Sequence, residues 1–375
     1  MSTPLAAVVT GLGTSEVGRR LRRDPLELTA QACLAALSDA GLSSGDIDGV
    51  STYPGPFHLT PGFTGAGVVD ACDLLGITPR WHSGGSEVPG QLGSISNAVL
   101  AVSAGVADHV LCFRTVWEST AQLAEGRAAA VTSNVGFQPF RTWGVPFGAT
   151  GVTSGALDAQ RYFHQYGATR EQLARIALNA RCNAAANPLA VYRDPMTLDD
   201  YLAARIVSSP LCIYDCDPPV DGSIAIIVSN PAATGDSERP SVTIEAIGTG
   251  MGYRQAADIM WSQTSIGPGD VDVAEVYDGF SIYSWLWLEG LGFCKPGEAA
   301  SFVEGGSRIA LDGELPLATG GGQLSAGRLH GYLHVLEACT QLRGDGGDRQ
   351  VYPRPEVAVA SNGAVRFTGC LLLSC

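Results

Sequence analysis

The stretch Ser44-Gly45-Asp46-Ile47-Asp48-Gly49-Val50 returns, in outline, far along the same chain. The later copy reads Gly267-Pro268-Gly269-Asp270-Val271-Asp272-Val273-Ala274-Glu275-Val276-Tyr277. Each copy follows a predicted helix and runs through a turn of small residues into an Asp–aliphatic–Asp triplet and an apolar strand. Because self-similarity on this scale reports on the fold, the two copies predict a duplicated α/β architecture.

A second pair of segments repeats in the same order. A helix expected around residues 94–104 leads to the apolar strand 109–112. A helix expected around residues 333–342 likewise leads to the strand 357–359. The repeated unit therefore contains several elements, which favours two complete halves over a single recurring motif.

The repeats divide the chain into two predicted halves, residues 1–235 and 236–375. They meet in the turn-rich segment 229–240. Residues from about 115 to 219 have no counterpart in the second half. We expect this excursion to form a cap, or loop region, laid over the core.

The composition excludes several classes of protein. The chain has 375 residues, of which 45% are hydrophobic and 16% charged, and its net charge is −14. Such a charge repels nucleic acid and anionic membrane surfaces. No run reaches the roughly 18 apolar residues of a membrane-spanning helix, and the start of the chain does not resemble a signal peptide. We therefore expect a cytoplasmic protein that binds neither nucleic acid nor membrane.

The cysteines predict neither disulfides nor a metal site. Ten are present, and most stand singly inside apolar runs. Cys212 and Cys216 form a lone CxxxC without a second pair. Small buried thiols in a reducing compartment explain this distribution.

One glycine-rich stretch concentrates the chemistry, and it reads Gly321-Gly322-Gln323-Leu324-Ser325-Ala326-Gly327-Arg328-Leu329-His330-Gly331-Tyr332. Glycines allow a backbone to pass close to a ligand and to turn sharply. Arg328, His330 and Tyr332 then place three groups capable of acid, base or anion chemistry within five residues. The alternative is an ordinary glycine-rich connection with exposed polar residues.

Several motifs in this order carry a family resemblance. They are Asp39-Ala40-Gly41-Leu42, Tyr166-Gly167-Ala168-Thr169-Arg170, Asn187-Pro188, Asp221-Gly222-Ser223, Tyr277-Asp278-Gly279-Phe280 and the Gly321 loop. With them the chain resembles the thiolase superfamily, and within it the sterol-carrier-protein-x or lipid-transfer-type branch. The resemblance implies a five-layered α/β/α/β/α fold with two mixed five-stranded sheets around central helices. It also implies an acyl-CoA substrate and a homodimer formed through a core strand and the nucleophile helix.

Four positions depart from the thiolase pattern. They are the nucleophilic cysteine, the histidine of Gly-His-Pro, the late acid–base cysteine and the oxyanion-supporting Asn or His. The residues now present there are Val88, Arg328, Ser361 and Tyr277. No cysteine stands between Cys72 and Cys112, so the covalent thioester chemistry of a thiolase lacks its nucleophile.

With these four departures the chain resembles the steroid side-chain-cleaving aldolases. Those enzymes cleave a β-hydroxyacyl-CoA by a retro-aldol reaction, and they pair with a small zinc-ribbon/OB-fold protein. The resemblance implies no bound cofactor, since the substrate supplies the CoA moiety, and no metal. Retro-aldol cleavage needs a base, donors to the enolate oxygen and an acid. The catalytic candidates are Tyr277, His330 and Tyr332, with Arg328 holding negative charge. The substrate-binding candidates are Asp278, Gly321, Gly322, Gly327 and Ser361. In these aldolases another tyrosine is expected where Arg328 stands.

Each candidate also has a purely structural interpretation. Tyr277 and Tyr332 could pack in the core, and His330 could bond to carbonyls of its loop. Arg328 could pair with Asp278 or Glu337, and Asp278 could bind backbone amides. Two other functions stay open: an acyl-CoA C-acyltransferase with an unrecognised nucleophile, and a non-catalytic subunit that binds acyl-CoA or lipid.

Overall fold

A computed structural model describes residues 5–55, 61–85, 92–125, 144, 147–235, 239–365 and 367–375. The position of Val88 lies outside these ranges. The main sheet consists of β1 (Val8–Thr14), β2 (Gly49–Thr52), β3 (Trp81–Gly84), β4 (His109–Trp117), β7 (Asp221–Ser229), β8 (Val242–Gly250), β9 (Val273–Glu275), β10 (Val357–Asn362) and β11 (Thr368–Ser374). Their order in space is β3-β2-β4-β7-β1-β8-β11-β10-β9. A separate two-stranded sheet pairs β5 (Ile206–Ser208) with β6 (Leu211–Cys212).

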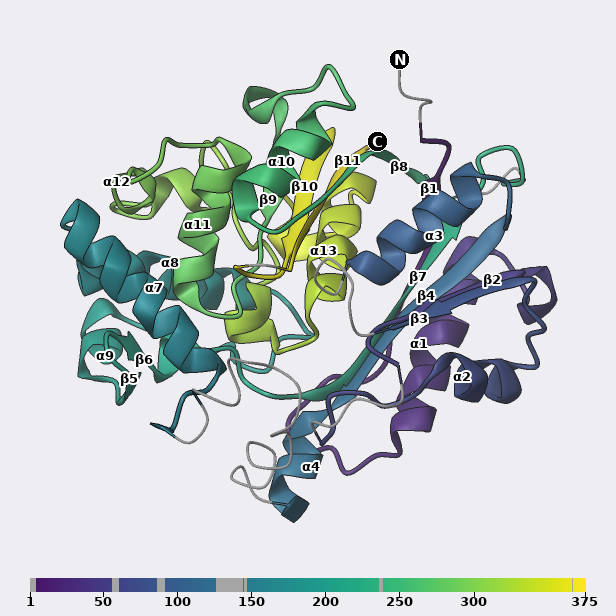
Figure 1. Ribbon diagram of the computed structural model, residues 1–375, viewed down its shortest axis with the longest axis horizontal. Helices are drawn as coiled ribbons and strands as arrows, with labels where there is room; N and C mark the ends of the chain where they lie inside the picture. The colour runs from purple at the N-terminus through teal and green to yellow at the C-terminus, as the bar shows by residue number, and fades with distance from the viewer. Residues whose placement is uncertain are drawn as a thin grey trace.

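The helices divide into those of the core and those of the cap. The core helices are α1 (Pro25–Ala40), α2 (Val68–Leu75), α3 (Gly93–Ser103), α10 (Tyr253–Trp261), α11 (Ser281–Leu291), α12 (Ala299–Phe302) and α13 (Gly331–Arg343). The cap region contributes α4 (Glu118–Glu125), α7 (Gly151–Tyr166), α8 (Arg170–Ala184) and α9 (Leu198–Ala203). Figure 1 shows α3 and α13 near the middle of the molecule, with α1 and α2 on one side and α10 and α11 on the other. Within the described ranges, no helix is long and apolar enough to cross a membrane.

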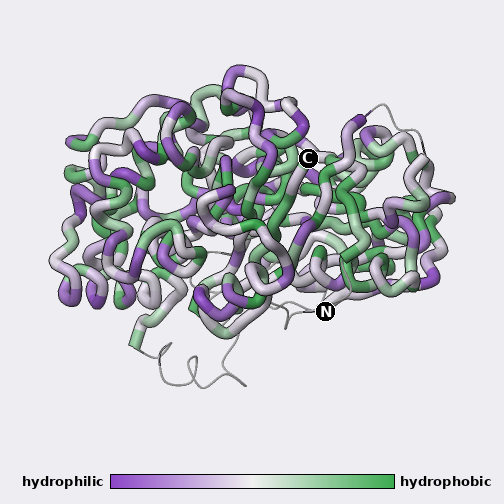
Figure 2. The backbone as a smooth tube through the Cα atoms, turned by 90° about the horizontal axis from the view of Figure 1, so that it is seen from above, coloured by the Kyte–Doolittle hydropathy of each residue, from purple (hydrophilic) through white to green (hydrophobic). Residues whose placement is uncertain are grey.

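Alternating side chains on the strands build the predicted five layers. In β7, Ile224 and Ile226 enter the central core with α3 and α13, whereas Ala225 and Ile227 enter the core beneath α1 and α2. The strands of the second half alternate in the same way between the central core and the core under α10 and α11. Figure 2 shows the resulting green, apolar strands in the interior. The α/β/α/β/α arrangement expected from the sequence is therefore present.

The prediction of two separate five-stranded sheets was wrong in detail. Among the described residues, the first half contributes five strands and the second half four, all within one hydrogen-bonded sheet. The halves join where Val8 and Val9 of β1 pair with Thr243 and Val242 of β8. At the far edge, a single parallel bridge from Ala274 to Leu317 stands where the first half has β3.

The predicted duplication is confirmed down to individual hydrogen bonds. The Asp48 carboxylate accepts the amides of Asp108 and His109, where β4 begins, at 3.0 and 2.9 Å. The Asp272 carboxylate accepts two amides where β10 begins, at 2.9 and 3.0 Å. Each aspartate precedes a strand that pairs in parallel with the strand it anchors. The same Asp–aliphatic–Asp triplet thus fixes the same strand pair in both halves.

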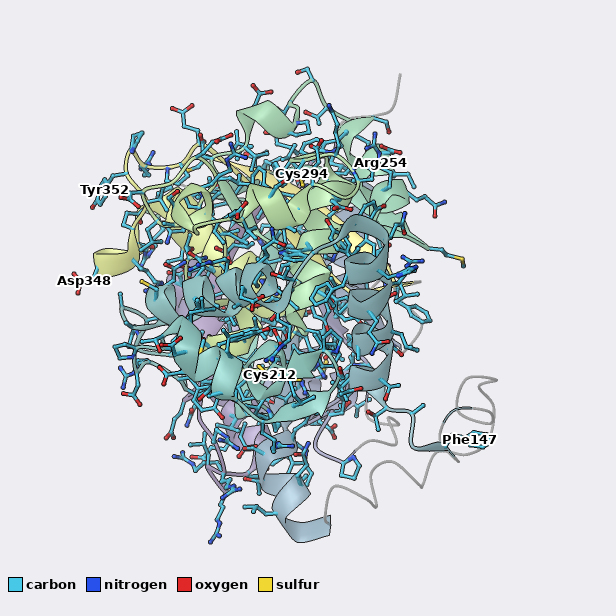
Figure 3. All side chains as sticks on the ribbon, turned by 90° about the vertical axis from the view of Figure 1, so that its left-hand side faces the viewer. Phe147, Cys212, Arg254, Cys294, Asp348 and Tyr352 are labelled. Carbon is cyan, nitrogen blue, oxygen red and sulfur yellow. The ribbon has the colours of Figure 1, made fainter. Side chains whose placement is uncertain are left out.

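β4 continues to Trp117, and the excursion from about residue 115 to 219, with its role as a cap, stays a prediction. Its helices α7 and α8 pack against α11 in the outer layer of the second half, where the rings of Tyr162 and Trp285 lie 5.1 Å apart. Figure 1 shows α7, α8, α9, β5 and β6 gathered beside α11 and α12. Phe147, which precedes α7 and is 86% exposed, projects away from the body, as Figure 3 shows. The boundary between the halves at residue 235 stays a prediction.

Candidate active site

The glycine-rich stretch of the sequence forms a connection between the edge of the sheet at β9 and α13. Residues Gly322–Ala326 form one π-helical turn, and His330 then caps the start of α13. Gly321, Gly322 and Gly327 all have positive φ angles, of 97°, 54° and 117°. At Gly322 the glycine is needed for a second reason, since a Cβ atom there would overlap the carboxylate of Asp278. The backbone therefore passes close to Asp278 at this point, and the expected approach to a ligand stays a prediction.

Asp278 fastens this turn to the end of β9. Its Oδ1 accepts the amide of Gln323 at 2.8 Å and its Oδ2 accepts the amide of Leu324 at 3.2 Å. Burial raises the pKa of Asp278 to about 7. The carboxylate thus binds backbone amides, the structural role that the sequence left open for it.

The side chain of Gln323 ties the turn to α13. Its Oε1 accepts the backbone amide of His330 at 3.0 Å. Its Nε2 lies 3.4 Å from Nε2 of His334, a histidine that is completely buried. Burial lowers the pKa of His334 to about 3, so this ring is neutral at ordinary pH. Gln323 therefore fixes the backbone from which the His330 ring projects.

Tyr277 follows the end of β9, and its ring lies against the backbone of Gly279. Its backbone amide donates to Oγ of Ser361 at 3.1 Å, and its ring stacks on Tyr283 at 5.9 Å. The hydroxyl lies against Gly279, where a Cβ atom would overlap it. Within the described residues that hydroxyl makes no hydrogen bond. Burial, with the negative charge of Asp217, holds the pKa of Tyr277 well above its usual value, so the phenol keeps its proton.

Arg328 is held by two carboxylates. Its Nε lies 2.9 Å from Oδ1 of Asp217, and its Nη1 lies 3.0 Å from Oε2 of Glu118. Both acids are buried, and the guanidinium is 24% exposed. These partners differ from Asp278 and Glu337, which the sequence suggested. Two carboxyls therefore face one guanidinium, and burial raises the pKa of both Glu118 and Asp217.

His330 contacts a second arginine. Nη2 of Arg114, in β4, lies 3.3 Å from Nδ1 of His330, and Nη1 donates to the carbonyl of Tyr53 at 2.9 Å. The Arg114 guanidinium also packs over the ring of Phe63 at 4.5 Å, and that ring meets His330 edge-on at 4.9 Å. Arg114 is completely buried, and burial lowers its pKa to about 10.

Tyr332 lies deeper than the other candidates. It is completely buried in the central core, and its hydroxyl lies 2.7 Å from Oγ of Ser94 at the start of α3. Burial holds the pKa of Tyr332 well above its usual value. The structure therefore gathers Tyr277 and Arg328 around Asp217, sets His330 beside Arg114, and places Tyr332 in a packing position.

The thiols near these groups are poor nucleophiles. Burial raises the pKa of Cys33 and of Cys339 to about 12, and it raises the pKa of Cys112 further. Cys216, beside the Arg328 cluster, has its pKa raised to about 12 by burial and by Asp215 and Asp217. No set of three or more metal-binding side chains comes together within the described ranges.

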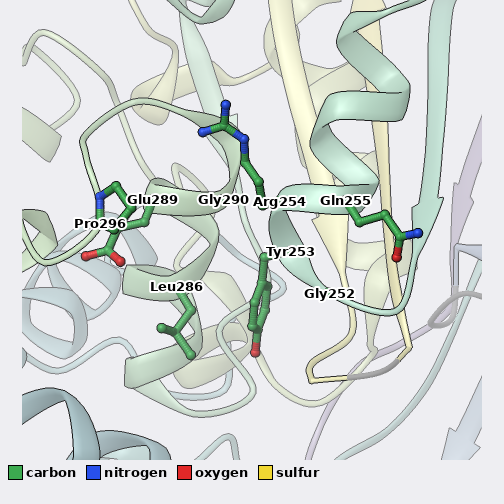
Figure 4. Close-up of a pocket in the computed structure, with 8 residues that line it drawn as sticks. All are labelled: Gly252, Tyr253, Arg254, Gln255, Leu286, Glu289, Gly290 and Pro296. Atoms are coloured by element: carbon green, nitrogen blue, oxygen red, sulfur yellow. The ribbon is translucent and has the colours of Figure 1, made fainter.

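A pocket of about 350 Å³ lies elsewhere, between α10 and α11. Its lining residues, drawn in Figure 4, are Gly252, Tyr253, Arg254, Gln255, Leu286, Glu289, Gly290 and Pro296. None of them belongs to the Gly321 loop or to the surroundings of Tyr277. Glu289 is already bonded to the Tyr162 hydroxyl and to the amide of Gly297, so this pocket offers few unengaged polar groups.

Sequence reasoning missed Glu118, Asp217, Gln323 and Arg114. Glu118 and Asp217 became visible only through contacts between distant segments, whereas Gln323 lies inside the quoted glycine-rich loop. Arg114 had a local signal, because it is a lone cation in the middle of an apolar strand, and a buried arginine in that position requires partners.

Known proteins resemble this chain over nearly its full length. Residues 237–371 match the family described as thiolase C-terminal domain-like. The chain is 32% identical over 367 residues to a steroid side-chain-cleaving aldolase of Thermomonospora curvata, with 91% of each chain covered. It is 32% identical over 362 residues to the 17-hydroxy-3-oxo-4-pregnene-20-carboxyl-CoA lyase of Mycobacterium tuberculosis, covering 90% of this chain and 92% of that one. The solved structure of the Ltp2-ChsH2(DUF35) aldolase superposes with a TM-score of 0.87 at 29% identity, covering 100% of this chain and 99% of that chain.

Proposed function

Since the chain belongs to the thiolase-fold steroid side-chain-cleaving aldolases, we propose that it cleaves a β-hydroxyacyl-CoA by a retro-aldol reaction. The substrate carries a steroid or another bulky lipid group on the β-carbon. The products are a ketone and a short acyl-CoA. The observation that carries the assignment is the Tyr277 phenol, which is protonated and makes no hydrogen bond within the described residues.

The reaction requires one proton to be removed and one to be returned. A base takes the proton of the β-hydroxyl, the bond between the α- and β-carbons breaks, and the β-carbon becomes the carbonyl of the ketone. The electron pair of the broken bond passes to the thioester as an enolate. An acid then protonates the α-carbon, so the net proton count is unchanged and no covalent enzyme intermediate is needed.

The geometry distributes these tasks among a few groups. Tyr277, held in its protonated form, suits the role of a donor to the enolate oxygen or of the acid. The base has to be a group that can accept the proton of the β-hydroxyl. Asp217 and Glu118 outnumber Arg328, and burial raises the pKa of both carboxyls, so we assign the proton acceptor to this cluster. Arg328 then sets the charge of the cluster without binding the substrate directly.

We also propose how the enzyme assembles. No bound cofactor is required, because the CoA moiety arrives with the substrate. We propose a homodimer formed through the edge strand β3 and the neighbouring α3. The superposed aldolase is named together with a second protein, ChsH2(DUF35), and this supports a small zinc-ribbon/OB-fold partner here. Such a partner would complete the enzyme and act in the cytoplasm with it.

The test is to purify the chain together with its candidate partner and to add 17-hydroxy-3-oxo-4-pregnene-20-carboxyl-CoA. Its 17-hydroxyl is β to the thioester, so cleavage should release a 17-ketosteroid and propionyl-CoA, both measurable by mass spectrometry. A shorter β-hydroxyacyl-CoA without the steroid serves as the control for substrate size. Trapping of an acyl-enzyme would support an acyltransferase instead, and binding without cleavage would support a non-catalytic subunit.

A further inference from the structure

We propose that Arg114 is a positioning residue that keeps the imidazole of His330 in the tautomer with its proton on Nε2. The ring then acts as a hydrogen-bond donor to the developing enolate oxygen. The tautomer follows from this structure alone, and only the role toward the enolate rests on the proposed function.

The chemistry of the two side chains determines the direction of their contact. A guanidinium has five N–H groups and no acceptor, so it can only donate. Nη2 of Arg114 lies 3.3 Å from Nδ1 of His330, and Nδ1 must therefore be the acceptor. A neutral imidazole with an unprotonated Nδ1 carries its proton on Nε2. His330 thus presents an N–H group on the side of the ring that faces away from Arg114.

Arg114 is itself held firmly enough to impose this choice. Its Nη1 donates to the carbonyl of Tyr53 at 2.9 Å, and its planar group packs over the ring of Phe63. Within the described ranges no carboxylate forms an ion pair with it. The acidic group whose negative charge reaches it at ordinary pH is Glu118. Its positive charge therefore lies directly beside the imidazole, at the Nδ1 atom that accepts its N–H.

The backbone of His330 also restricts where its ring can lie. The residue has φ 60° and ψ −154°, a conformation that residues other than glycine rarely adopt. Its amide is held by Oε1 of Gln323 at 3.0 Å. The bond from the backbone to Gln323 and the contact between Nδ1 and Arg114 together fix the orientation of the ring, and with it the direction in which the Nε2–H group points.

The experiment uses the full-length protein, labelled with 15N-histidine. Long-range 1H–15N correlation spectra distinguish the two neutral tautomers, and the His330 signals are identified by their absence in His330→Asn. The expected result for the unmodified protein is the Nε2–H tautomer. Observation of the Nδ1–H tautomer would overturn the proposal whether or not the protein cleaves any substrate.

Variants of Arg114 extend the test to catalysis. Arg114→Met should give a mixture of tautomers and lower kcat by about 10- to 100-fold with little change in KM, because the donor is no longer aligned. Arg114→Lys, which can still donate, should retain the tautomer and recover part of kcat. Arg254→Met, on the exposed face of α10, is the matched control. An unchanged tautomer and kcat in Arg114→Met would also overturn the proposal, whereas absence of cleavage by the unmodified enzyme would count only against the proposed function.

Discussion

Two nitrogens of Arg328 converge on one oxygen of Asp217: Nε and Nη2 lie 2.9 and 2.7 Å from Oδ1. Arg328 belongs to the Gly321 loop, and Asp217 belongs to the last residues of the cap excursion. The buried pair therefore ties the cap to the loop directly beside Tyr277. A change at either residue should alter both stability and the charge that Tyr277 experiences.

Removal of Arg328 should destabilise the protein severely. Arg328→Met leaves two buried carboxylates without a counter-charge and should cost about 3–5 kcal/mol. Adding Asp217→Asn removes one of those charges and should restore part of the loss. Urea denaturation measures both, with Arg254→Met as the control, since its exposed pair with Asp258 is worth less than about 1 kcal/mol. Equal losses of stability in Arg328→Met and in Arg254→Met would contradict the importance of the pair between Arg328 and Asp217.

Tyr277→Phe should separate catalysis from folding. The substitution deletes a hydroxyl that makes no hydrogen bond within the described residues, and the ring still stacks on Tyr283. Turnover should fall by about 10²- to 10³-fold if the phenol is a donor to the enolate oxygen. Steady-state kinetics and thermal denaturation measure the two effects, and Tyr352→Phe, at a position that is 78% exposed, is the control. Unchanged turnover would remove Tyr277 from the mechanism.

Gly322 and Asp278 should behave as one unit. Gly322→Ala forces a Cβ atom against the Asp278 carboxylate, and Asp278→Asn removes an acceptor from one loop amide. Each should cost roughly 1–3 kcal/mol, and the double variant should cost less than the sum. Gly151→Ala is a suitable control, because a Cβ atom there meets nothing within 4 Å. If urea denaturation shows that the stability costs of the two single variants simply add in the double variant, the two residues do not share a contact.

Glu275 should make stability depend on pH. Burial and the nearby Glu337 raise the pKa of Glu275 well above its usual value, so the folded state binds this proton more tightly than the unfolded state. Its stabilising contribution is complete below the unfolded pKa of about 4.3 and is lost as pH rises through the folded value, by up to about 1.4 kcal/mol per pH unit. Glu275→Gln should reduce this slope in denaturation at a series of pH values, and the raised pKa of Asp278 should maintain part of the remainder. Glu304→Gln, at an exposed site, should leave the slope unchanged, and an equally steep slope in Glu275→Gln would show that Glu275 does not contribute to it.

The sequence predicted those parts of the fold that local patterns determine. The helix expected around residues 333–342 lies inside α13, and the apolar strand expected at 109–112 lies inside β4. The duplication was visible because both copies kept the Asp–aliphatic–Asp triplet. The pairing of β1 with β8, which joins the halves, was not visible in the sequence, because pairing between distant strands leaves no local periodicity.

The same distinction between local sequence patterns and long-range contacts applies to the candidate site. The Gly321 loop and Tyr277 stood out because glycines and reactive side chains cluster in sequence. The partners of Arg328 and of His330 are contributed by β4, by the residue after it and by the end of the predicted excursion. The sequence marks Arg114 as unusual in an apolar strand, but no local pattern shows which residues contact each other. Tyr332 shares the loop's composition but points into the core, which only packing could show.

The single bridge between Ala274 and Leu317 suggests how a duplicated chain of this kind can change its activity. A duplicated scaffold holds two versions of the same connector, one leading from β3 to α3 and the other from the bridge to α13. The second version has a single bridge in place of a full strand, and beyond it Asp278 binds the amides of Gln323 and Leu324. Substitutions there can change the reaction without unpairing the sheet. A new activity can thus arise in one copy while its twin preserves the architecture.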